Sequence, residues 1–259
     1  MQREPDRGII KIGVMDSGMG GLSVLKELLN SPFRAEYLYF GDLLNAPYGE
    51  RETSEVADLT RKACEFLIQK GAQAILLACN TATSAAASLL RSDLPIPIFG
   101  MEPAIKPALA NHPGERIALL ATSVTHREEK LKTLKASLGA DERIVHVSCD
   151  GLASLVDRGD MKGAGDYLKR ILAQLEEEKI RGIVLGCTHY VFLKDVIMSL
   201  SPDSKLYDGN IGTVTHLVRS LGLDSNLGEP IYELHFSKNL LEIDPFEQAR
   251  KLLGFFSEP

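Results

Sequence analysis

This chain of 259 residues lacks several features that would point directly to a function. It has no apolar segment near the ~20 residues that a membrane-spanning helix needs, so we expect no membrane insertion. The four cysteines, Cys64, Cys79, Cys149 and Cys187, are widely spaced, which predicts neither a disulfide framework nor a CxxC zinc site. The net charge is -6 and no block of basic residues occurs, which argues against an obvious nucleic-acid or membrane surface.

Residues 1–7 are polar and lack the apolar stretch of a secretory signal. This favours a cytoplasmic location, where the reducing environment keeps thiols free. Hydrophobic residues make up 44% of the chain, enough to build one large or two modest cores. We therefore expect a globular protein whose cysteines are unpaired.

Short aliphatic or β-branched runs alternate with longer segments of helical periodicity along the chain. Strands are predicted at residues 9–15, 36–40, 74–78, 96–100, 116–121, 144–148, 182–186 and 205–207. Helices are predicted at residues 53–70, 127–138, 165–179 and 190–200. Strands separated by helices of this length indicate βαβ units, with mainly parallel sheets flanked by helices. The predicted fold class is α/β.

Two matching segments, LLACNT at residues 76–81 and VLGCTH at 184–189, carry Cys79 and Cys187. A long helix and a connecting glycine precede each of the two predicted strands, and this internal similarity predicts two similar domains. Ligands of open α/β sheets collect at the carboxyl ends of the strands, so both thiols should face an active site in the interdomain cleft. We place the first domain at residues 1–101 plus 212–259 and the second at residues 102–211.

Two thiols at one site suit proton transfer at a carbon atom. A thiolate removes a proton and a thiol delivers one, so two such groups allow removal on one side of a C–H bond and delivery on the other. Cys79 and Cys187 directly precede predicted helix starts, which should lower the thiol pKa. His189 is placed to orient or polarise the Cys187 thiol, and nucleophilic Cys-His catalysis stays open. Cys64 and Cys149 have settings typical of small buried side chains.

No standard nucleotide or metal motif is present. Gly18, Gly20 and Gly21 form a turn between the first strand and a helix, and amides at a helix start favour an anion such as phosphate or carboxylate. Their spacing matches neither GxGxxG nor the P-loop, which argues against a nucleotide site. Asp16 is either a turn or cap residue or a functional one. The run Cys187-Thr188-His189 lacks metal-ligand partners at the usual spacing, so no metal is expected.

Four stretches, read together, resemble the cofactor-independent aspartate/glutamate racemase superfamily, and within it the glutamate racemases. They are DSGMGGLSV at residues 16–24, FGD with PYG at 40–42 and 47–49, ACNTA at 78–82, and LGCTHY at 185–190. These motifs span nearly the entire chain in the order found in that family. The resemblance implies an isomerase that interconverts L- and D-glutamate, supplies D-glutamate for bacterial peptidoglycan, needs no cofactor and forms a homodimer.

The resemblance also implies which residues act. Cys79 and Cys187 would be the acid-base pair on opposite faces of the substrate, with Asp16 assisting Cys79 and His189 assisting Cys187. The implied substrate contacts are Asp16, Ser17, Tyr48, Gly49, Asn80, Thr81, Thr122, Thr188 and His189. No pyridoxal lysine motif is evident, so preorganised donors and water exclusion would have to stabilise the carbanion-like state.

Some positions depart from the family pattern. Asp157 stands where the family often has a glutamate, and its side chain is one methylene shorter, which argues against an auxiliary role for it. Cys149-Asp150 replaces a frequent Cys-Pro, and Tyr190-Val191 replaces a frequent Tyr-Pro. Residues 43–46 also differ from the common pattern, which bears on the pocket edge and on substrate choice.

Three other functions remain open on the sequence. A racemase of another acidic amino acid such as aspartate would use the same two thiols on a different side chain. A cysteine-dependent amidase or hydrolase would use one nucleophile and form an acyl-enzyme. A non-enzymatic binder of small acids would keep the two domains without turnover.

Overall fold

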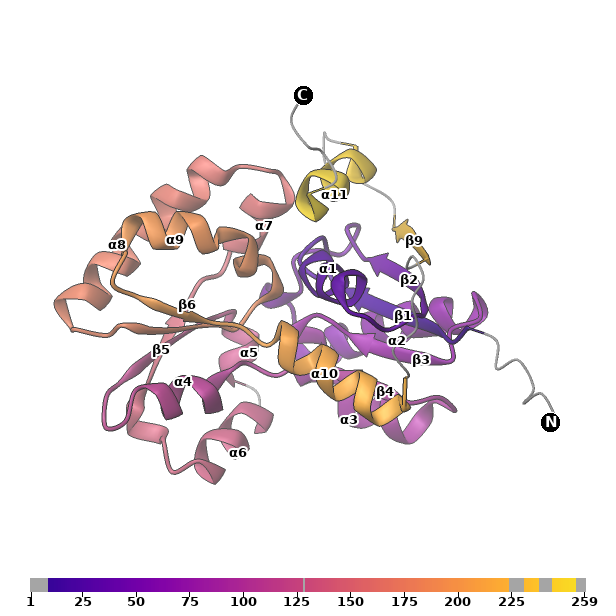
Figure 1. Cartoon of the computed structure of the whole chain (residues 1–259), viewed down its shortest axis with the longest axis horizontal. Helices are drawn as coiled ribbons and strands as arrows, with labels where there is room; N and C mark the ends of the chain where they lie inside the picture. The colour runs from indigo at the N-terminus through magenta and orange to yellow at the C-terminus, as the bar shows by residue number, and fades with distance from the viewer. Residues whose placement is uncertain (1–8, 128, 224–230, 238–243, 255–259) are drawn as a thin grey trace.

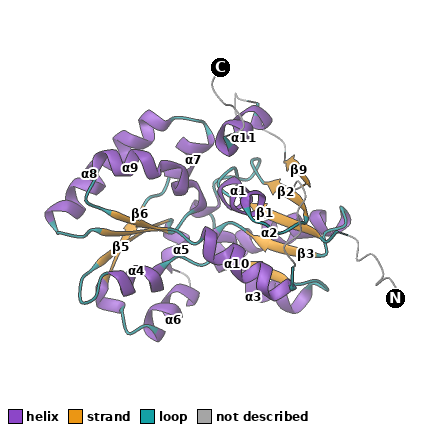
Figure 2. Cartoon of the chain, viewed as in Figure 1, coloured by secondary structure: helices purple, strands orange, loops and turns teal. Residues whose placement is uncertain are grey.

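The structure is a computed structural model that describes residues 9–127, 129–223, 231–237 and 244–254. Two parallel sheets lie beside each other, each covered by helices on both faces (Figures 1 and 2). The predicted α/β class is therefore confirmed. The polar segment at residues 1–7 lies outside the described residues.

The first sheet has five parallel strands in the order β4-β3-β1-β2-β9. These strands are β1 (Lys11–Asp16), β2 (Glu36–Gly41), β3 (Ala74–Leu77), β4 (Ile98–Gly100) and β9 (Ile231–Phe236). Its helices are α1 (Leu22–Asn30), α2 (Thr53–Gln69), α3 (Asn80–Asp93), α10 (Asn210–Leu221) and α11 (Pro245–Leu253). A short 3-10 helix, η1 (Tyr48–Glu50), precedes α2.

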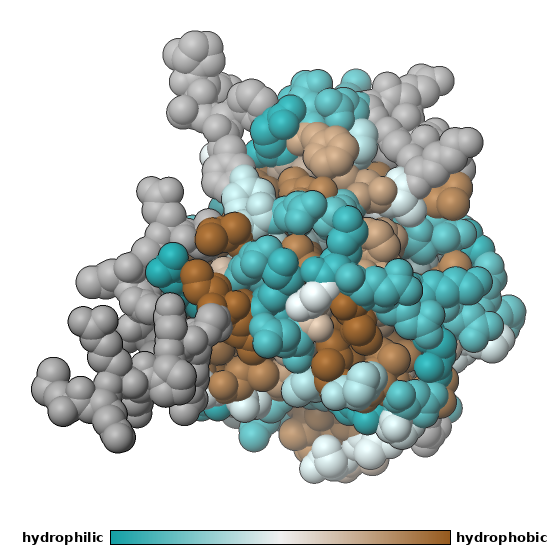
Figure 3. Space-filling view, turned by 90° about the vertical axis from the view of Figure 1, so that its right-hand side faces the viewer, coloured by the Kyte–Doolittle hydropathy of each residue, from teal (hydrophilic) through white to brown (hydrophobic). Residues whose placement is uncertain are grey.

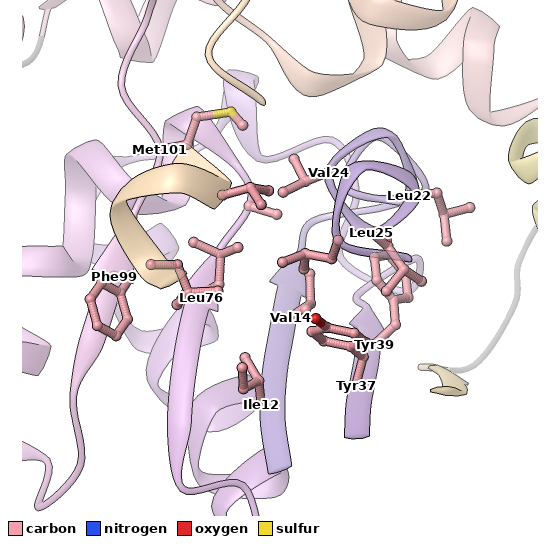
Figure 4. Close-up of a cluster of buried hydrophobic side chains, with 14 of the residues drawn as sticks. Ile12, Val14, Leu22, Val24, Leu25, Tyr37, Tyr39, Leu76, Phe99 and Met101 are labelled. Carbon is pink, nitrogen blue, oxygen red and sulfur yellow. The ribbon is translucent and has the colours of Figure 1, made fainter. Parts of the chain in front are cut away.

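Side chains along β1 point alternately to the two faces of the sheet, which explains why helices cover both faces. Ile12 and Val14 point into one core, which α1, α10 and α11 close, and Figure 4 shows part of that core. Met15 points into the opposite core, which α2 and α3 close. All three side chains are fully buried. The strand is therefore apolar between Lys11 and Asp16, as expected of a parallel sheet covered on both sides.

The second sheet has four parallel strands in the order β6-β5-β7-β8. They are β5 (Ile117–Ala121), β6 (Ile144–Ser148), β7 (Gly182–Leu185) and β8 (Lys205–Tyr207). Its helices are α4 (Ile105–Asn111), α5 (Ser123–Arg127), α6 (Glu129–Ser137), α7 (Leu152–Asp157), α8 (Met161–Glu177) and α9 (Lys194–Leu200), with 3-10 helices η2 (Asp141–Arg143) and η3 (Thr188–Leu193). Residues of α7, α8 and α9 pack on one face, and residues of α4 and α6 pack on the other.

All eight predicted strands are present, with ends that differ by at most two residues. Strand β9, at the edge of the first sheet, was not predicted, and its first three residues are exposed. The helix predicted at residues 127–138 is α6, and the short helix α5 that precedes it was not predicted. The helix predicted at 190–200 begins as the 3-10 helix η3 and continues as α9.

The chain passes from the first sheet to the second after β4 and returns after β8. Both α10 and α11 contribute side chains to the core beside α1. The division at residues 101 and 212 stays our proposal for the domain boundaries, and the second boundary would fall inside α10, which begins at Asn210.

Among the described residues, no helix has the length and apolarity that crossing a membrane requires. The right-hand face of Figure 1, turned to the viewer in Figure 3, shows apolar side chains in small groups among polar ones. A mixed surface of this kind is ordinary for a protein exposed to water.

Candidate active site

Strands from both sheets end at one small cavity. Cys79 follows β3 of the first sheet and precedes α3, and Cys187 follows β7 of the second sheet and precedes η3. Both cysteines line a cavity of about 20 Å³ together with Ser17 and His189. A space of that volume holds about one water molecule. The two thiols therefore border a nearly closed site.

The structure brings the predicted site residues together. Those that line the cavity are Ser17, Tyr48, Gly49, Cys79, Thr81, Thr122, Cys187 and His189. The other three, Asp16, Asn80 and Thr188, are buried and adjoin lining residues in the chain. Their placement is compatible with the predicted roles, which remain predictions.

Cys79 is a protonated thiol in this setting. Its Sγ accepts a hydrogen bond from the Ala82 amide at 3.4 Å and lies 3.6 Å from Ser17 Oγ. Burial, followed by the nearby Asp16 carboxylate, raises the pKa of Cys79 to about 12 despite these hydrogen bonds. The expectation that the helix start lowers this pKa is wrong, because desolvation of the thiolate outweighs the amide at the start of α3.

Cys187 belongs to a second group of contacts, with His189 and Asp157. Its Sγ lies 3.6 Å from His189 Nδ1, and His189 Nε2 lies 2.9 Å from Asp157 Oδ1. Asp157 Oδ1 also accepts a hydrogen bond from the Met19 amide at 3.0 Å. Sulfur, imidazole and carboxylate thus form a hydrogen-bonded row along the cavity wall. Although the Asp157 side chain is one methylene shorter than the glutamate of the family pattern, its carboxylate reaches His189.

The contacts of His189 with Asp157 and Cys187 determine its charge. Burial alone would lower the pKa of His189, but the charge and hydrogen bond of Asp157, followed by contact with Cys187, raise it well above its ordinary value. The Gly20 amide also lies 3.1 Å from Nε2, yet one nitrogen cannot both donate to Asp157 and accept from Gly20. The raised pKa favours donation to Asp157. The remaining Nδ1–H then points at Cys187 Sγ, where it can stabilise negative charge.

Asp16 connects the two sheets behind the cavity. Its Oδ1 accepts from the Gly18 amide at 2.8 Å, and its Oδ2 accepts from Thr188 Oγ1 at 3.1 Å. The side chain is fully buried, and burial raises the pKa of Asp16. A carboxyl group with a raised pKa beside Cys79 is suited to hold or pass on a proton near that thiol.

The glycine turn allows close approach of the second sheet's residues. A Cβ atom on Gly20 would overlap His189 Nδ1 and Thr188 Oγ1, and one on Gly18 would lie 2.7 Å from Asp157 Oδ2. The amides of Gly18 and Met19 already donate to the carboxylates of Asp16 and Asp157. The anion-binding amides of this turn are therefore occupied by the protein's own side chains.

Tyr48 is held by a buried carboxylate, and Gly49 packs beside Thr122. The Tyr48 hydroxyl donates to Asp42 Oδ2 at 2.7 Å, and the Asn45 amide donates to both oxygens of the same carboxylate. Burial, followed by the Asp42 charge, raises the pKa of Tyr48, so its hydroxyl stays protonated and keeps donating. Gly49 lies against Thr122, because a Cβ atom at Gly49 would meet the Thr122 side chain.

Comparison with known proteins agrees with this geometry. The model of the Asp/Glu/Hydantoin racemase family matches residues 21–217. The chain belongs to this racemase family.

Individual relatives of this racemase carry a more specific name. A glutamate racemase of Leptospira borgpetersenii is 59% identical over 255 residues, which cover 96% of this chain and 98% of the relative. A glutamate racemase of Leptospira interrogans is 59% identical over 212 residues, covering 82% of this chain and 83% of the relative.

Solved structures of glutamate racemases share the fold of this racemase. The Bacillus anthracis RacE1 structure has 30% identity and a TM-score of 0.79, covering 95% of this chain and 94% of that one. The Thermus thermophilus structure, in complex with beta-chloro-D-alanine, has 31% identity and a TM-score of 0.71, covering 96% and 93%.

Several residues that line the cavity of this racemase were not predicted as site residues. They are Ala46, Pro47, Glu50, Cys149, Asp150, Gly151, Ala153 and Asp157. Pro47 and Glu50 flank the Tyr48-Gly49 pair, so their proximity could have been inferred from chain position alone. Cys149 was interpreted as a buried side chain; it is fully buried and also borders the cavity. The family pattern, with a glutamate at the position of Asp157, was the signal that could have placed this residue at the site.

The site of this racemase offers both donors and acceptors to a charged amino acid. Hydroxyl groups of Ser17, Thr81 and Thr122 border the cavity and can donate to carboxylates. In the described part of the chain, Asn80 Oδ1 is buried without a hydrogen-bond partner. Asn80 adjoins the lining residues Cys79 and Thr81, so this buried acceptor lies beside the cavity wall.

Proposed function

We propose that this racemase interconverts L- and D-glutamate by proton transfer between the substrate Cα and two thiols, without a cofactor. The observation that carries the proposal is the placement of Cys79 and Cys187 after strands of different sheets, at one cavity. Inversion at a carbon atom needs a proton acceptor on one face and a donor on the other. The relatives named glutamate racemase support glutamate as the substrate.

The two thiols have settings suited to opposite roles in one turnover. Beside the His189 imidazolium, the Cys187 sulfur can carry negative charge and take the α-proton, so that the Cα–H bond breaks and an S–H bond forms. Cys79, whose pKa burial raises to about 12, then gives its proton to the opposite face of Cα. Cys187 ends as the thiol and Cys79 as the thiolate. The other enantiomer reacts by the reverse sequence.

Polar groups on both sides of the cavity would hold the substrate. Thr81, Thr122 and Ser17 donate to its carboxylates, and Asn80 Oδ1 accepts from its ammonium group. Fixing both ends places Cα between the two sulfurs, and such orientation is a large part of what a polar site contributes to catalysis.

The cavity must widen before glutamate can enter. Its volume of about 20 Å³ admits roughly one water molecule. Its walls come from both sheets, so we infer that the halves separate on binding and close again over the substrate. Closure excludes water and strengthens every polar contact with the developing carbanion. An unchanged angle between the sheets in free and substrate-bound structures would contradict this motion.

The test is turnover of purified protein without added cofactor. L-glutamate and D-glutamate are supplied separately, and optical activity is followed to equilibrium, with L- and D-aspartate in parallel. We expect both glutamate enantiomers to racemise and aspartate to react far more slowly. Faster turnover of aspartate would reassign the substrate. A trapped thioester with an amide substrate would instead indicate a cysteine hydrolase, to which the Cys187–His189 pair is also suited.

The biological setting follows from this activity. D-glutamate made by this racemase would enter bacterial peptidoglycan synthesis, and cytoplasmic location and homodimer formation are part of the proposal. Sedimentation of the purified protein with and without glutamate tests the dimer. Depletion of the protein in its host, with D-glutamate supplied in the medium as the rescue, tests the role in cell-wall synthesis.

A further inference from the structure

Three threonine hydroxyl groups meet at the wall of the cavity, and one of them was not predicted to belong to the site. Thr81 Oγ1 lies 3.1 Å from Thr122 Oγ1 and 3.4 Å from Thr125 Oγ1, and Thr122 Oγ1 lies 3.1 Å from Thr125 Oγ1. Thr81 belongs to α3 of the first sheet's helices, and Thr125 belongs to α5 after β5 of the second sheet. We call these three residues the hydroxyl triangle.

The three residues of the hydroxyl triangle differ in whether they line the cavity. Thr81 and Thr122 line the cavity, whereas Thr125 is 1% exposed and borders a separate small space with Ser84 and Leu131. Thr125 is thus behind the two residues that can touch substrate. It is fixed there, since its backbone amide also donates to Thr122 Oγ1 at 3.3 Å at the start of α5.

The Thr125 hydroxyl supplies a hydrogen-bond donor within the triangle when a carboxylate is bound. Each threonine hydroxyl has one hydrogen to donate, so in the free protein three hydrogens serve the three sides of the triangle. A carboxylate in the cavity only accepts, so Thr81 and Thr122 must turn their hydrogens toward it. The hydrogen of Thr125 is then the one left within the triangle, and it can donate to the oxygen of either neighbour.

We propose that Thr125 is a positioning residue of the active site, which holds the Thr81 and Thr122 hydroxyls in the orientation that donates to a substrate carboxylate. The inference rests on the proposed racemase function and adds a residue to it. Because hydrogen bonds in a chain polarise one another, donation by Thr125 also makes its neighbours better donors to the substrate. Asp150 supports the same arrangement, since its Oδ1 accepts from the Ser123 amide at 2.9 Å and anchors the start of α5.

The test replaces the hydroxyl by a methyl group of similar size in Thr125→Val. We expect KM for both glutamate enantiomers to rise by roughly fivefold to tenfold, the effect of one neutral hydrogen bond, with kcat changed much less. Thr125→Ser retains the hydroxyl and should restore most of the wild-type KM. Thr60→Val is the matched control, because the buried Thr60 hydroxyl donates to the Val56 carbonyl inside α2.

The outcomes separate the inference from the proposed function. Wild-type turnover with an unchanged KM in Thr125→Val, or a Thr125→Ser variant as impaired as Thr125→Val, would overturn the positioning role alone. A wild-type protein that racemises no acidic amino acid would overturn the proposed function and this inference with it. If Thr125→Val lowers Tm no more than Thr60→Val yet alone raises KM, the role in positioning is established apart from folding.

Discussion

His189 Nε2 lies 2.9 Å from Asp157 Oδ1, in a pair whose side chains are 4% and 7% exposed. A buried imidazole next to a buried carboxylate is held as a cation, and its second nitrogen faces Cys187 Sγ at 3.6 Å. The carboxylate thereby acts on the sulfur through the ring. Removing the carboxylate charge should change the chemistry at a thiol that it does not touch.

The first prediction concerns Asp157→Asn. The substitution removes the charge that raises the pKa of His189, so the imidazolium should lose its proton at lower pH. We expect kcat/KM to fall by about tenfold or more, the equivalent of at least one pKa unit, and the alkaline limb of its pH profile to move to lower pH. Steady-state kinetics across the pH range measure both effects.

Two further variants test this reading of Asp157. Asp157→Glu keeps the charge and should retain most activity, and Asp166→Asn, which removes an exposed carboxylate that pairs with Lys169, should leave the profile unchanged. An Asp157→Asn variant with the wild-type pH profile would contradict the coupling of Asp157 to His189.

A second prediction links the same pair to stability. The pKa of His189 is raised in the folded state, so the folded protein binds this proton more tightly than the unfolded chain. The resulting stability is fully present below the unfolded pKa of about 6.5 and is lost as pH rises through the folded pKa. The Tm difference between wild type and His189→Gln should therefore shrink as pH rises. A difference that grows with pH would refute the assignment.

Much of this site could be predicted from the sequence. Burial and the contacts between residues far apart in the sequence could not. Both thiols directly follow apolar runs predicted as strands, and ligands of open α/β sheets collect at the carboxyl ends of strands, so both could be predicted at the site. The pKa of Cys79 was predicted in the wrong direction, because a sequence shows the helix start but not the burial that outweighs it.

Long-range contacts explain the other differences. Asp157 contacts His189 across 32 residues of chain, and Thr125 contacts Thr81 across 44, so neither pair forms a local motif. The glycines at residues 18, 20 and 21 indicated that another group lies close to this turn. The sequence could not show that this group is the side chains of Thr188 and His189. Edge strand β9 is exposed over its first three residues and lacks the continuous apolar run that marked the buried strands.

The third prediction tests that close approach through Gly20→Ala. The added methyl group would overlap His189 Nδ1 and Thr188 Oγ1, so it must push His189 away from Cys187 or shift the turn. Overpacking of this kind typically destabilises by ~1–3 kcal/mol, and we expect it to cost activity as well. Denaturant unfolding and steady-state kinetics report the two effects.

Gly212→Ala is the control for Gly20→Ala. A Cβ atom at Gly212 meets no described atom within 4 Å, and the residue lies inside α10. The control should stabilise by roughly 0.5–1 kcal/mol, because alanine favours a helix over glycine, and should leave turnover unchanged. Equal activity in the Gly20→Ala and Gly212→Ala variants would argue against a tight contact at Gly20.

The fourth prediction concerns the two thiols separately. Cys79→Ser and Cys187→Ser each replace a proton carrier by a hydroxyl that ionises far less readily, so each should reduce racemisation by roughly 10²–10⁴-fold. Cys64→Ser is the matched control, since Cys64 is buried in α2 within the core of the first sheet. Because the enantiomers have equal free energies, kcat/KM must fall by the same factor in both directions for every variant.

Deuterium incorporation during a single turnover tests the two-thiol account most directly. L-glutamate is incubated with wild-type protein in deuterated water, and both enantiomers are analysed at low conversion. The account predicts D-glutamate that carries solvent deuterium at Cα, while the remaining L-glutamate is still largely protonated, because different thiols serve the two faces. D-glutamate that retains the original proton, or deuterium that enters both enantiomers equally from the start, would show one proton carrier and contradict the account.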